Sequence, residues 1–443
     1  MIEKSFAARQ GEGTRFRLYP QAPLLVGYRT PVVVELSPVS GSLEPGPSDG
    51  RVCVIHPVGK AQSYGQLMAR HGVTKPILPP WRGPVSNPAL PDDRGHFDHL
   101  GPNDAGFAQA HAYACVRLTL DVWERYLGRR IQWNFASGMR WLEVGLLDSY
   151  TNGECSWGGW LELGSDVDPD RPPHPFALNL DVVAHEVGHL LVYSLVGLPP
   201  SSRDFGEYAG FQEAAADLVA LLVAAQLPTV VNEVLKRTRG NLYVANELNR
   251  LGELSSNSQI RQASNSARLS EFALGWSDEH DLSEPLTGAL FDLLVDMYQH
   301  ELIDRQLIPT SLDRLVREVG HLRPFAPMVQ AEFDRWYPVD PRGFRQALVA
   351  ACDRLGTYFA HALTRLRADR LTYVAVQKVL TDVDLALGGG QFGREITDNF
   401  AWREIGRVDV GPYLGMAGGR PSALQLGVHR CAKRDLLPRQ GSS

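Results

Sequence analysis

Residues 180–197, LDVVAHEVGHLLVYSLVG, have the apolar spacing and the end signals of an α-helix of about four turns. Either Asn179 or Asp181 can cap the first turn through a side-chain oxygen. Gly197, followed closely by two prolines, is a stop signal at the other end. We therefore predict one helix over this stretch, and the relative positions of its polar side chains follow from the helical repeat.

Two histidines of this helix, His185 and His189, are four residues apart, so they lie on one face. Imidazoles at this spacing can bind one metal ion, and with Glu186 they form the pattern His-Glu-x-x-His. Glu186 is expected beside the ion but angled away from it, where a general base for a metal-activated water is needed. The alternative is a helix with two partly exposed histidines, so a zinc site requires a third ligand.

The stretch GFQEAAADLVALLVAAQ, residues 210–226, is apolar on nearly all sides and predicts a buried helix. Its only charged residues, Glu213 and Asp217, are one turn apart, where two carboxylates repel each other and are costly to bury. A buried cation relieves both problems. Glu213 can complete a zinc site with one position open for water, and Asp217 can accept the free N–H of a ligand histidine. The alternative is that arginines pair with both carboxylates in a structural network.

Together these stretches resemble thermolysin-type metallopeptidases of the gluzincin group, over about residues 105–300. LDVVAHEVGH is close to the signature of the family's zinc helix, and GEYAGFQEAAAD resembles the segment that carries its third ligand. The resemblance implies one Zn²⁺ per chain, held by His185, His189 and Glu213. It also makes Glu186 the general base and Asp217 the partner of a ligand histidine.

Weaker similarities extend this site. The stretch EHDLSEPLTGALFDLL is closer to the fungalysin branch and implies that His280 stabilises the oxyanion; the alternative is a loop histidine at a helix start. Tyr208 is a candidate second oxyanion donor. Arg250 lies upstream of His280 at roughly the distance of the family arginine that binds the substrate carbonyl.

The stretch NGECSWGGWLELG resembles the family's edge strand, which pairs with an extended peptide substrate. In that interpretation Gly158 and Gly159 permit close approach of the peptide, and Trp157 and Trp160 flank it. An ordinary hairpin with core tryptophans is an equal alternative.

The predicted fold class is α+β, a two-lobed thermolysin-like arrangement. Strands are expected in TPVVVELSP and RVCVIHPVG, a long helix over 106–128, and mostly helices over 286–385. The expected parts are a β-rich segment or small domain over 1–100, an α/β catalytic lobe over 101–228, a helical lobe over 229–405 and a Gly/Pro-rich tail over 406–443.

The charge and composition of the whole chain argue against some classes of protein. It has 443 residues, a net charge of −6 and no basic stripe, which argues against nucleic acid as a partner. Its first residues have no apolar signal-peptide core, and no apolar run is long enough to span a bilayer. We therefore expect no membrane insertion and a cytoplasmic location, with leaderless export left open. Five scattered cysteines favour reduced thiols over a disulfide framework.

These observations predict a zinc metallopeptidase, an endopeptidase that hydrolyses peptide bonds through a zinc-activated water. One alternative is a restricted peptidase or amidase that processes one dedicated peptide. Another is a catalytically silent zinc-stabilised binding protein, although zinc binding alone does not need Glu186. The signal peptide, long propeptide and calcium ligands common in the resembled family are not visible. A polar cluster of Asp93, His96, Asp98 and His99 is a candidate second metal site, but a polar loop is favoured because prolines surround it.

Overall fold

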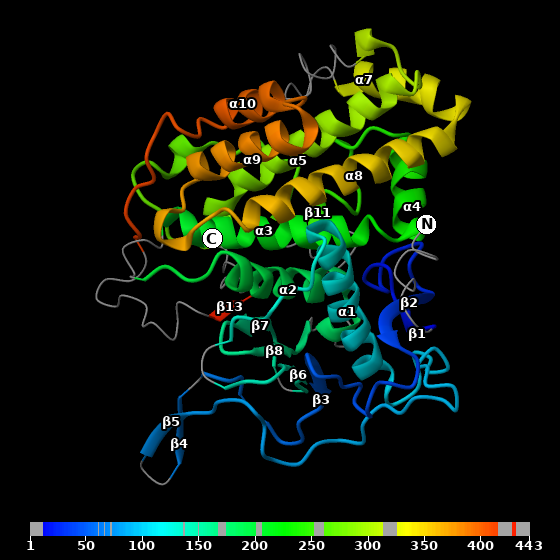
Figure 1. Cartoon of the computed structure of the whole chain (residues 1–443), viewed down its shortest axis with the longest axis vertical. Helices are drawn as coiled ribbons and strands as arrows, with labels where there is room; N and C mark the ends of the chain where they lie inside the picture. The colour runs from blue at the N-terminus through cyan, green and yellow to red at the C-terminus, as the bar shows by residue number, and fades with distance from the viewer. Residues whose placement is uncertain are drawn as a thin grey trace, which may run out of the picture.

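The computed structural model describes residues 12–60, 62–65, 67–70, 73–135, 138–148, 150–166, 174–200, 206–251, 261–312, 326–414 and 428–430. These residues form a mixed α and β fold, in which a small sheet is covered by helices (Figure 1). The mixed class matches the sequence prediction. The two-lobed arrangement and the domain boundaries at residues 100, 228 and 405 stay predictions.

The main sheet has five strands in the order β13-β7-β8-β6-β3. Strands β3, β6 and β8 run parallel to one another, while β7 runs antiparallel to both β8 and β13. The strands are β3 (Val52–Ile55), β6 (Leu142–Leu146), β7 (Gly153–Ser156), β8 (Trp160–Leu163) and β13 (Val428–Arg430). Because β3 belongs to this sheet, the segment before residue 100 contributes a strand to it.

One face of the sheet is covered by two helices. Helix α1 (Phe107–Leu127) packs against β3 and β6, and α2 (Leu180–Leu195) packs against β7 and β8 (Figure 1). The long helix predicted over 106–128 is thus confirmed. Alternate residues of a strand point to opposite faces, so the apolar side chains beneath the helices come from every second position, as with Val144 and Leu161.

The remaining helices lie beyond α2, on its side away from the sheet (Figure 1). Helix α3 (Gly206–Ala224) packs along α2, and α5 (Glu279–Asp304) packs along α3. The others are α4 (Pro228–Thr238), α7 (Ala326–Trp336), α8 (Pro341–Leu363), α9 (Tyr373–Gly388) and α10 (Gly393–Trp402). They agree with the mostly helical pattern predicted over 286–385.

Four small antiparallel pairs complete the described strands. The pair β1 and β2 packs on α1, and the pair β11 and β12 lies near α3. Their bounds are β1 (Gly13–Leu18), β2 (Val32–Val39), β4 (Leu67–Arg70), β5 (Val73–Pro76), β9 (Ser165–Asp166), β10 (His174–Pro175), β11 (Arg250–Leu251) and β12 (Arg261–Gln262).

Helices α2 and α3 approach each other closely at a glycine. A Cβ atom at Gly188 of α2 would lie 2.7 Å from the Cα atom of Ala216 on α3, closer than real Cβ atoms come. The bare glycine therefore lets the two backbones pack tightly. The polar residues of α2 and α3 lie within one helical turn of this contact. The close packing of the two helices therefore also brings these polar side chains together.

No single described helix is long and apolar enough to cross a membrane, and α3 with α4 reaches that length and composition only as a pair bent by 95°. The cysteines in the described part of the chain, Cys53, Cys115, Cys155 and Cys352, are free thiols. Cys431 and most of the predicted tail over 406–443 lie outside the described residues.

Candidate metal centre

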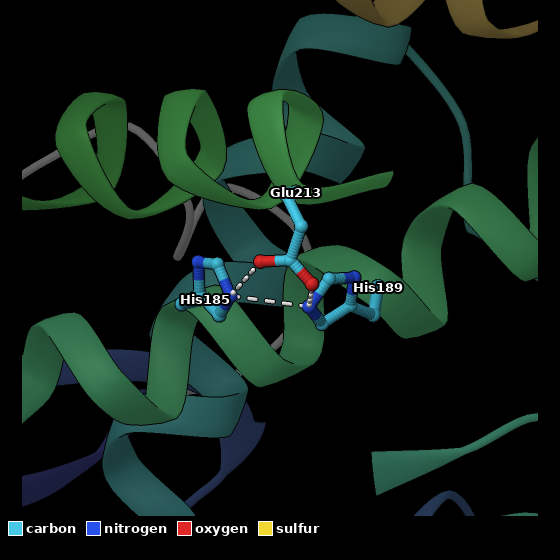
Figure 2. A group of neighbouring side chains, drawn as sticks. All are labelled: His185, His189 and Glu213. Atoms are coloured by element: carbon cyan, nitrogen blue, oxygen red, sulfur yellow. Dashed lines mark hydrogen bonds and ion pairs between the residues drawn. The ribbon is translucent and has the colours of Figure 1, made fainter. Parts of the chain in front are cut away.

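The facing sides of α2 and α3 bring three potential metal ligands together. The Nε2 atoms of His185 and His189 are 3.1 Å apart. Glu213 places Oε2 3.3 Å from Nε2 of His185 and Oε1 3.5 Å from Nε2 of His189. Figure 2 shows the carboxylate of Glu213 directed between the two imidazoles. All three side chains are buried, so their polar atoms converge in a place that water does not reach freely.

These spacings fit a zinc ion. Zinc binds imidazole nitrogen and carboxylate oxygen at about 2.0–2.2 Å in tetrahedral geometry, which places neighbouring ligand atoms about 3.3 Å apart. The two Nε2 atoms are 3.1 Å apart, and each faces a different oxygen of Glu213, at 3.3 and 3.5 Å, so all three separations are near that value. Within the described part of the chain, this is the one group of three or more histidine, cysteine or carboxylate side chains that meets closely enough to hold a metal.

The outer nitrogen of each histidine has its own hydrogen-bond acceptor. Nδ1 of His185 is 3.0 Å from Oδ1 of Asp217, and Nδ1 of His189 is 3.1 Å from Oε1 of Gln212. Both acceptors favour a proton on Nδ1, which leaves the Nε2 lone pair facing the ligand group. Asp217 therefore lies where the sequence predicted it, whereas Gln212 was not singled out because an amide one residue before Glu213 matches no motif.

Tyr208 is directed away from the ligand group. Its hydroxyl donates to the carbonyl oxygen of Gly197 at 2.6 Å and accepts from Nε2 of Gln212, also at 2.6 Å. This pair of bonds orients the Gln212 amide, so that its oxygen accepts from His189. In this structure Tyr208 acts on His189 through Gln212. Its oxyanion role stays a prediction.

Arg261, on β12, is a residue that the sequence analysis missed. Its guanidinium donates to both oxygens of Asp217, at 2.6 and 2.8 Å, and its Nη2 lies 3.0 Å from Nδ1 of His185. Its Nη1 lies 3.5 Å from Glu213. An arginine thus meets both Glu213 and Asp217, as the structural alternative proposed, but it does so beside two converging histidines.

The predicted substrate arginine, Arg250, occupies a different position. It pairs with Gln262 across the ladder of β11 and β12, whereas Arg261 pairs with Leu251. Neighbouring pairs in a ladder project from opposite faces. The guanidinium at the ligand group is therefore that of Arg261, and no sequence motif distinguishes the two arginines.

The charges around Asp217 are nearly balanced. Burial alone raises the pKa of Asp217, but the charge of Arg261 and the hydrogen bond from His185 outweigh it, so the pKa falls below its usual value. Asp217 thus stays ionised and is neutralised by Arg261. Two further carboxylates remain at the ligand group, Glu213 and Glu186, and Arg261 does not neutralise them through Asp217.

Glu186 projects from α2 toward β7 and is completely buried. Burial raises its pKa to about 7, although His185 and a hydrogen bond with the Cys155 thiol oppose the shift. Among the described residues, no N–H or O–H group hydrogen-bonds either carboxylate oxygen. A buried carboxylate of this kind has the pKa and the free acceptor sites that a general base needs.

His280 reaches the group from the first turn of α5. Its Nδ1 lies 2.7 Å from Oδ1 of Asp278, the residue that caps the helix, and its Nε2 lies 3.5 Å from Oε2 of Glu213. Burial lowers the pKa of His280, but the charge of Glu213 and the hydrogen bond with Asp278 outweigh it and raise the pKa to about 9. His280 is therefore a helix residue beside the ligand group, not an isolated loop histidine.

The stretch with two tryptophans forms a hairpin. Residues 157–159 make the tight turn between β7 and β8, with a positive φ of 89° at Gly159. Trp160 is buried on β8 and its ring lies 5.7 Å from that of Tyr64, on the face of the sheet away from α2. Trp157, Gly158, Gly159 and Trp160 thus lie in a hairpin whose strand next to α2 is β7, and their substrate-binding role stays a prediction.

The polar cluster near residue 96 is a loop held by hydrogen bonds and an ion pair. Asp92 accepts from the backbone N–H of His96, and Asp98 pairs with Arg15 of β1 at 3.0 Å. The loop interpretation is thus confirmed. Its histidines and carboxylates do not form a metal group by the criterion that His185, His189 and Glu213 meet.

Comparison with known proteins leaves the family open. No family model matches the chain, and no curated protein matches it. A solved structure that is similar in part is that of the precursor of protealysin, a metalloproteinase from Serratia proteamaculans. It is 14% identical, and the match covers 78% of this chain and 89% of that chain at a TM-score of 0.42. A likeness of this extent does not establish a shared family, so the side chains of the site carry the functional proposal.

Proposed function

We propose that this protein is a zinc-dependent peptidase of the thermolysin-like kind that its sequence resembles. The observation that carries the proposal is the buried convergence of His185, His189 and Glu213 at the spacing of a tetrahedral zinc shell. A structural zinc site needs four protein ligands, whereas three leave a position for a reactant. Glu186, buried beside the group with both oxygens free of N–H and O–H donors, adds the base that hydrolysis requires.

A zinc ion held by these three side chains supplies Lewis acidity, which polarises a carbonyl group and lowers the pKa of a water molecule. The protein residues move the protons. Glu186 takes a proton from the attacking water and then delivers it to the leaving amine. His280, oriented by Asp278, donates a hydrogen bond to the oxygen that becomes negatively charged.

The positioning residues keep this arrangement fixed. Asp217 and Gln212 hold the two ligand imidazoles by their outer nitrogens. Arg261 neutralises Asp217 and lies on the His185 side of the group. Its Nη1 lies 3.5 Å from Glu213, at the edge of the site, where it can donate to a second carbonyl of a peptide. Arg261 thus takes the substrate role that the sequence assigned to Arg250.

The first test is the metal content of the purified protein by elemental mass spectrometry. We expect about one zinc ion per chain, loss of peptide hydrolysis after removal of the metal with a chelator, and recovery on addition of Zn²⁺. His189→Ala should bind no zinc. His361→Ala, which changes a half-buried histidine on α8, is the matched control and should retain it. A protein that binds no zinc after reconstitution would overturn the proposal.

A digest of mixed peptides then defines the kind of peptidase. Many cleavages indicate a general endopeptidase, and a single cleavage indicates a peptidase restricted to one substrate. Absence of cleavage by protein with full zinc content would leave only a zinc-stabilised binding protein and would contradict the enzymatic proposal.

A further inference from the structure

The strand next to α2 is already paired with another part of the same chain. Residues 428–430 form β13, which runs antiparallel to β7 in the register Val428 with Ser156, His429 with Cys155 and Arg430 with Glu154. Figure 1 shows this short C-terminal strand beside β7, at the outer edge of the sheet. Without β13, β7 would be the edge strand, with a free row of backbone N–H and C=O groups.

This edge lies next to the proposed base. Strand β7 packs against α2, the helix that carries Glu186, and Cys155 of β7 is near enough to Glu186 to influence its pKa. His429 is the register partner of Cys155. Since paired strands are about 4.8 Å apart, the backbone at position 429 runs one strand spacing from this neighbour of Glu186. A polypeptide on this edge is therefore placed to present a backbone carbonyl to the site.

The preceding described part of the tail is fixed on the other flank of the site. The backbone of Gly411 donates to the carbonyl oxygen of Phe272 at 2.9 Å, and that of Trp276 donates to the carbonyl oxygen of Pro412 at 3.1 Å. Trp276 is two residues before Asp278, the residue that orients His280. The tail thus touches the segment that leads to His280 and, further along the chain, the strand that carries Cys155.

We infer that residues 428–430 are a built-in occupant of the outer edge of β7, and that they compete there with an extended peptide substrate. This inference rests on the proposed peptidase function. Backbone pairing at a sheet edge accepts many sequences, so the tail and a substrate can use the same hydrogen bonds in the same antiparallel direction. They cannot use them at the same time.

Tethering makes this competition effective although the strand is short. A segment linked to its own binding site acts at an effective concentration on the order of 1 mM. A segment that binds with a Kd of about 0.1 mM therefore raises the apparent KM of a peptide substrate about tenfold. The value of kcat stays the same, because displaced tail leaves the reacting groups unchanged.

Proline substitution in the full-length protein tests the inference. In an antiparallel ladder, hydrogen-bonded positions alternate, so the pair His429→Pro and Arg430→Pro removes a donor whichever position pairs. The control places prolines at Gln440 and Ser442, beyond the paired residues. The variant should show faster hydrogen exchange at residues 153–156 and about tenfold lower KM with the same kcat. A peptide of residues 424–434, LQLGVHRCAKR, should raise the KM of the variant again and a scrambled peptide should not.

The outcomes separate this inference from the proposed function. Unchanged exchange at 153–156 together with an unchanged KM would overturn the inference even if the protein is an active peptidase. If the zinc-loaded protein hydrolyses no peptide, binding of a fluorescent extended peptide replaces KM as the readout. Tighter binding by the proline variant then supports the occupied edge although the peptidase proposal fails, and equal binding overturns the inference as well.

Discussion

The two faces of the five-stranded sheet both bury glutamates, but they neutralise them by different means. On the face away from α2, Glu154 of β7 and Glu162 of β8 are direct register partners, and Glu143 of β6 is close by. All three are almost fully buried. On the α2 face, the buried carboxylates are Glu186 and, one helix further, Glu213.

The outer face carries its own fixed donors. The ammonium group of Lys60, itself fully buried, forms an ion pair with Glu162. The backbone N–H of Tyr64 donates to the other oxygen of Glu162, and the hydroxyl of Tyr64 donates to Glu143. The N–H of Trp81 also donates to Glu143. A lysine ammonium donates protons and offers no lone pair to a metal, so this cluster is a structural network.

The inner face also has donors near Glu213, namely Arg261 and His280, but it differs because two imidazole lone pairs face the same carboxylate. Two imidazole nitrogens with outward-facing N–H groups converge on a carboxylate, and Glu186 has no N–H or O–H donor among the described residues. Burial of carboxylates is thus common to both faces and does not identify a metal site. The distinguishing feature is whether the surrounding groups donate protons or lone pairs.

The largest expected effect comes from removing one carboxylate on each face. Glu186→Gln should keep one zinc per chain and lose about a thousandfold in kcat, because an amide cannot take the proton of the attacking water. Glu162→Gln is the matched change on the outer face and should keep its activity. Steady-state kinetics on a peptide substrate measure both. Full activity of Glu186→Gln would contradict the mechanism.

The next largest effect is expected from replacing Lys60, whose ammonium group lies on the face of the sheet away from α2. Lys60→Met leaves Glu162 without its ion-pair partner in a buried position, which should lower the free energy of unfolding by about 3–5 kcal/mol. Zinc content should not change. Lys236→Met, at an exposed lysine of α4, is the control and should cost about 0–1 kcal/mol. Urea unfolding measures both, and equal stabilities would show that the outer network is not held by Lys60.

These two faces also show what local sequence can predict. Helices α2 and α3 have strong apolar patterns, and His185 and His189 are one helical turn apart. The sequence could therefore predict that His185, His189 and Glu213 come together. The pair of Lys60 and Glu162 is separated by 102 residues in the chain, and neither residue belongs to a motif. Arg261 lies on a two-residue strand and likewise belongs to no motif. Side chains placed by long-range packing leave no local signal.

The directions of side chains are equally hard to predict from the sequence. Tyr208 lies on α3, but the direction of its hydroxyl depends on Gln212 and on the carbonyl of Gly197 after α2, which the sequence pattern does not contain. The stretch around Trp157 was ambiguous between an edge strand and a hairpin. Both descriptions apply in part, because the hairpin contains β7 and the chain itself supplies the neighbouring strand.

A smaller effect is expected from changing Asp217, which accepts a hydrogen bond from His185. Asp217→Ala removes the acceptor that orients His185 and should weaken zinc affinity by about 10–100-fold in a chelator competition. This change also leaves Arg261 without its carboxylate. The double variant Asp217→Ala with Arg261→Met separates the two effects, since it removes the unpaired charge as well. If the double variant regains normal zinc affinity, the loss came from the charge of Arg261 and not from the missing hydrogen bond.

The smallest expected effect is on how the free energy of unfolding changes with pH. It arises from Glu162, on the face of the sheet away from α2. Burial, opposed by Lys60, raises the pKa of Glu162 from 4.5 to about 7. Between these values the folded chain binds a proton that the unfolded chain has lost, so the free energy of unfolding falls as pH rises through this interval, by at most about 1.4 kcal/mol per pH unit from this one group. In Glu162→Gln that contribution is absent. The difference between the two stability curves of the zinc-loaded proteins should therefore slope between about pH 4.5 and pH 7 and be flat above. Parallel curves throughout would mean that Lys60 keeps Glu162 ionised at every pH and that the outer face contains a true ion pair.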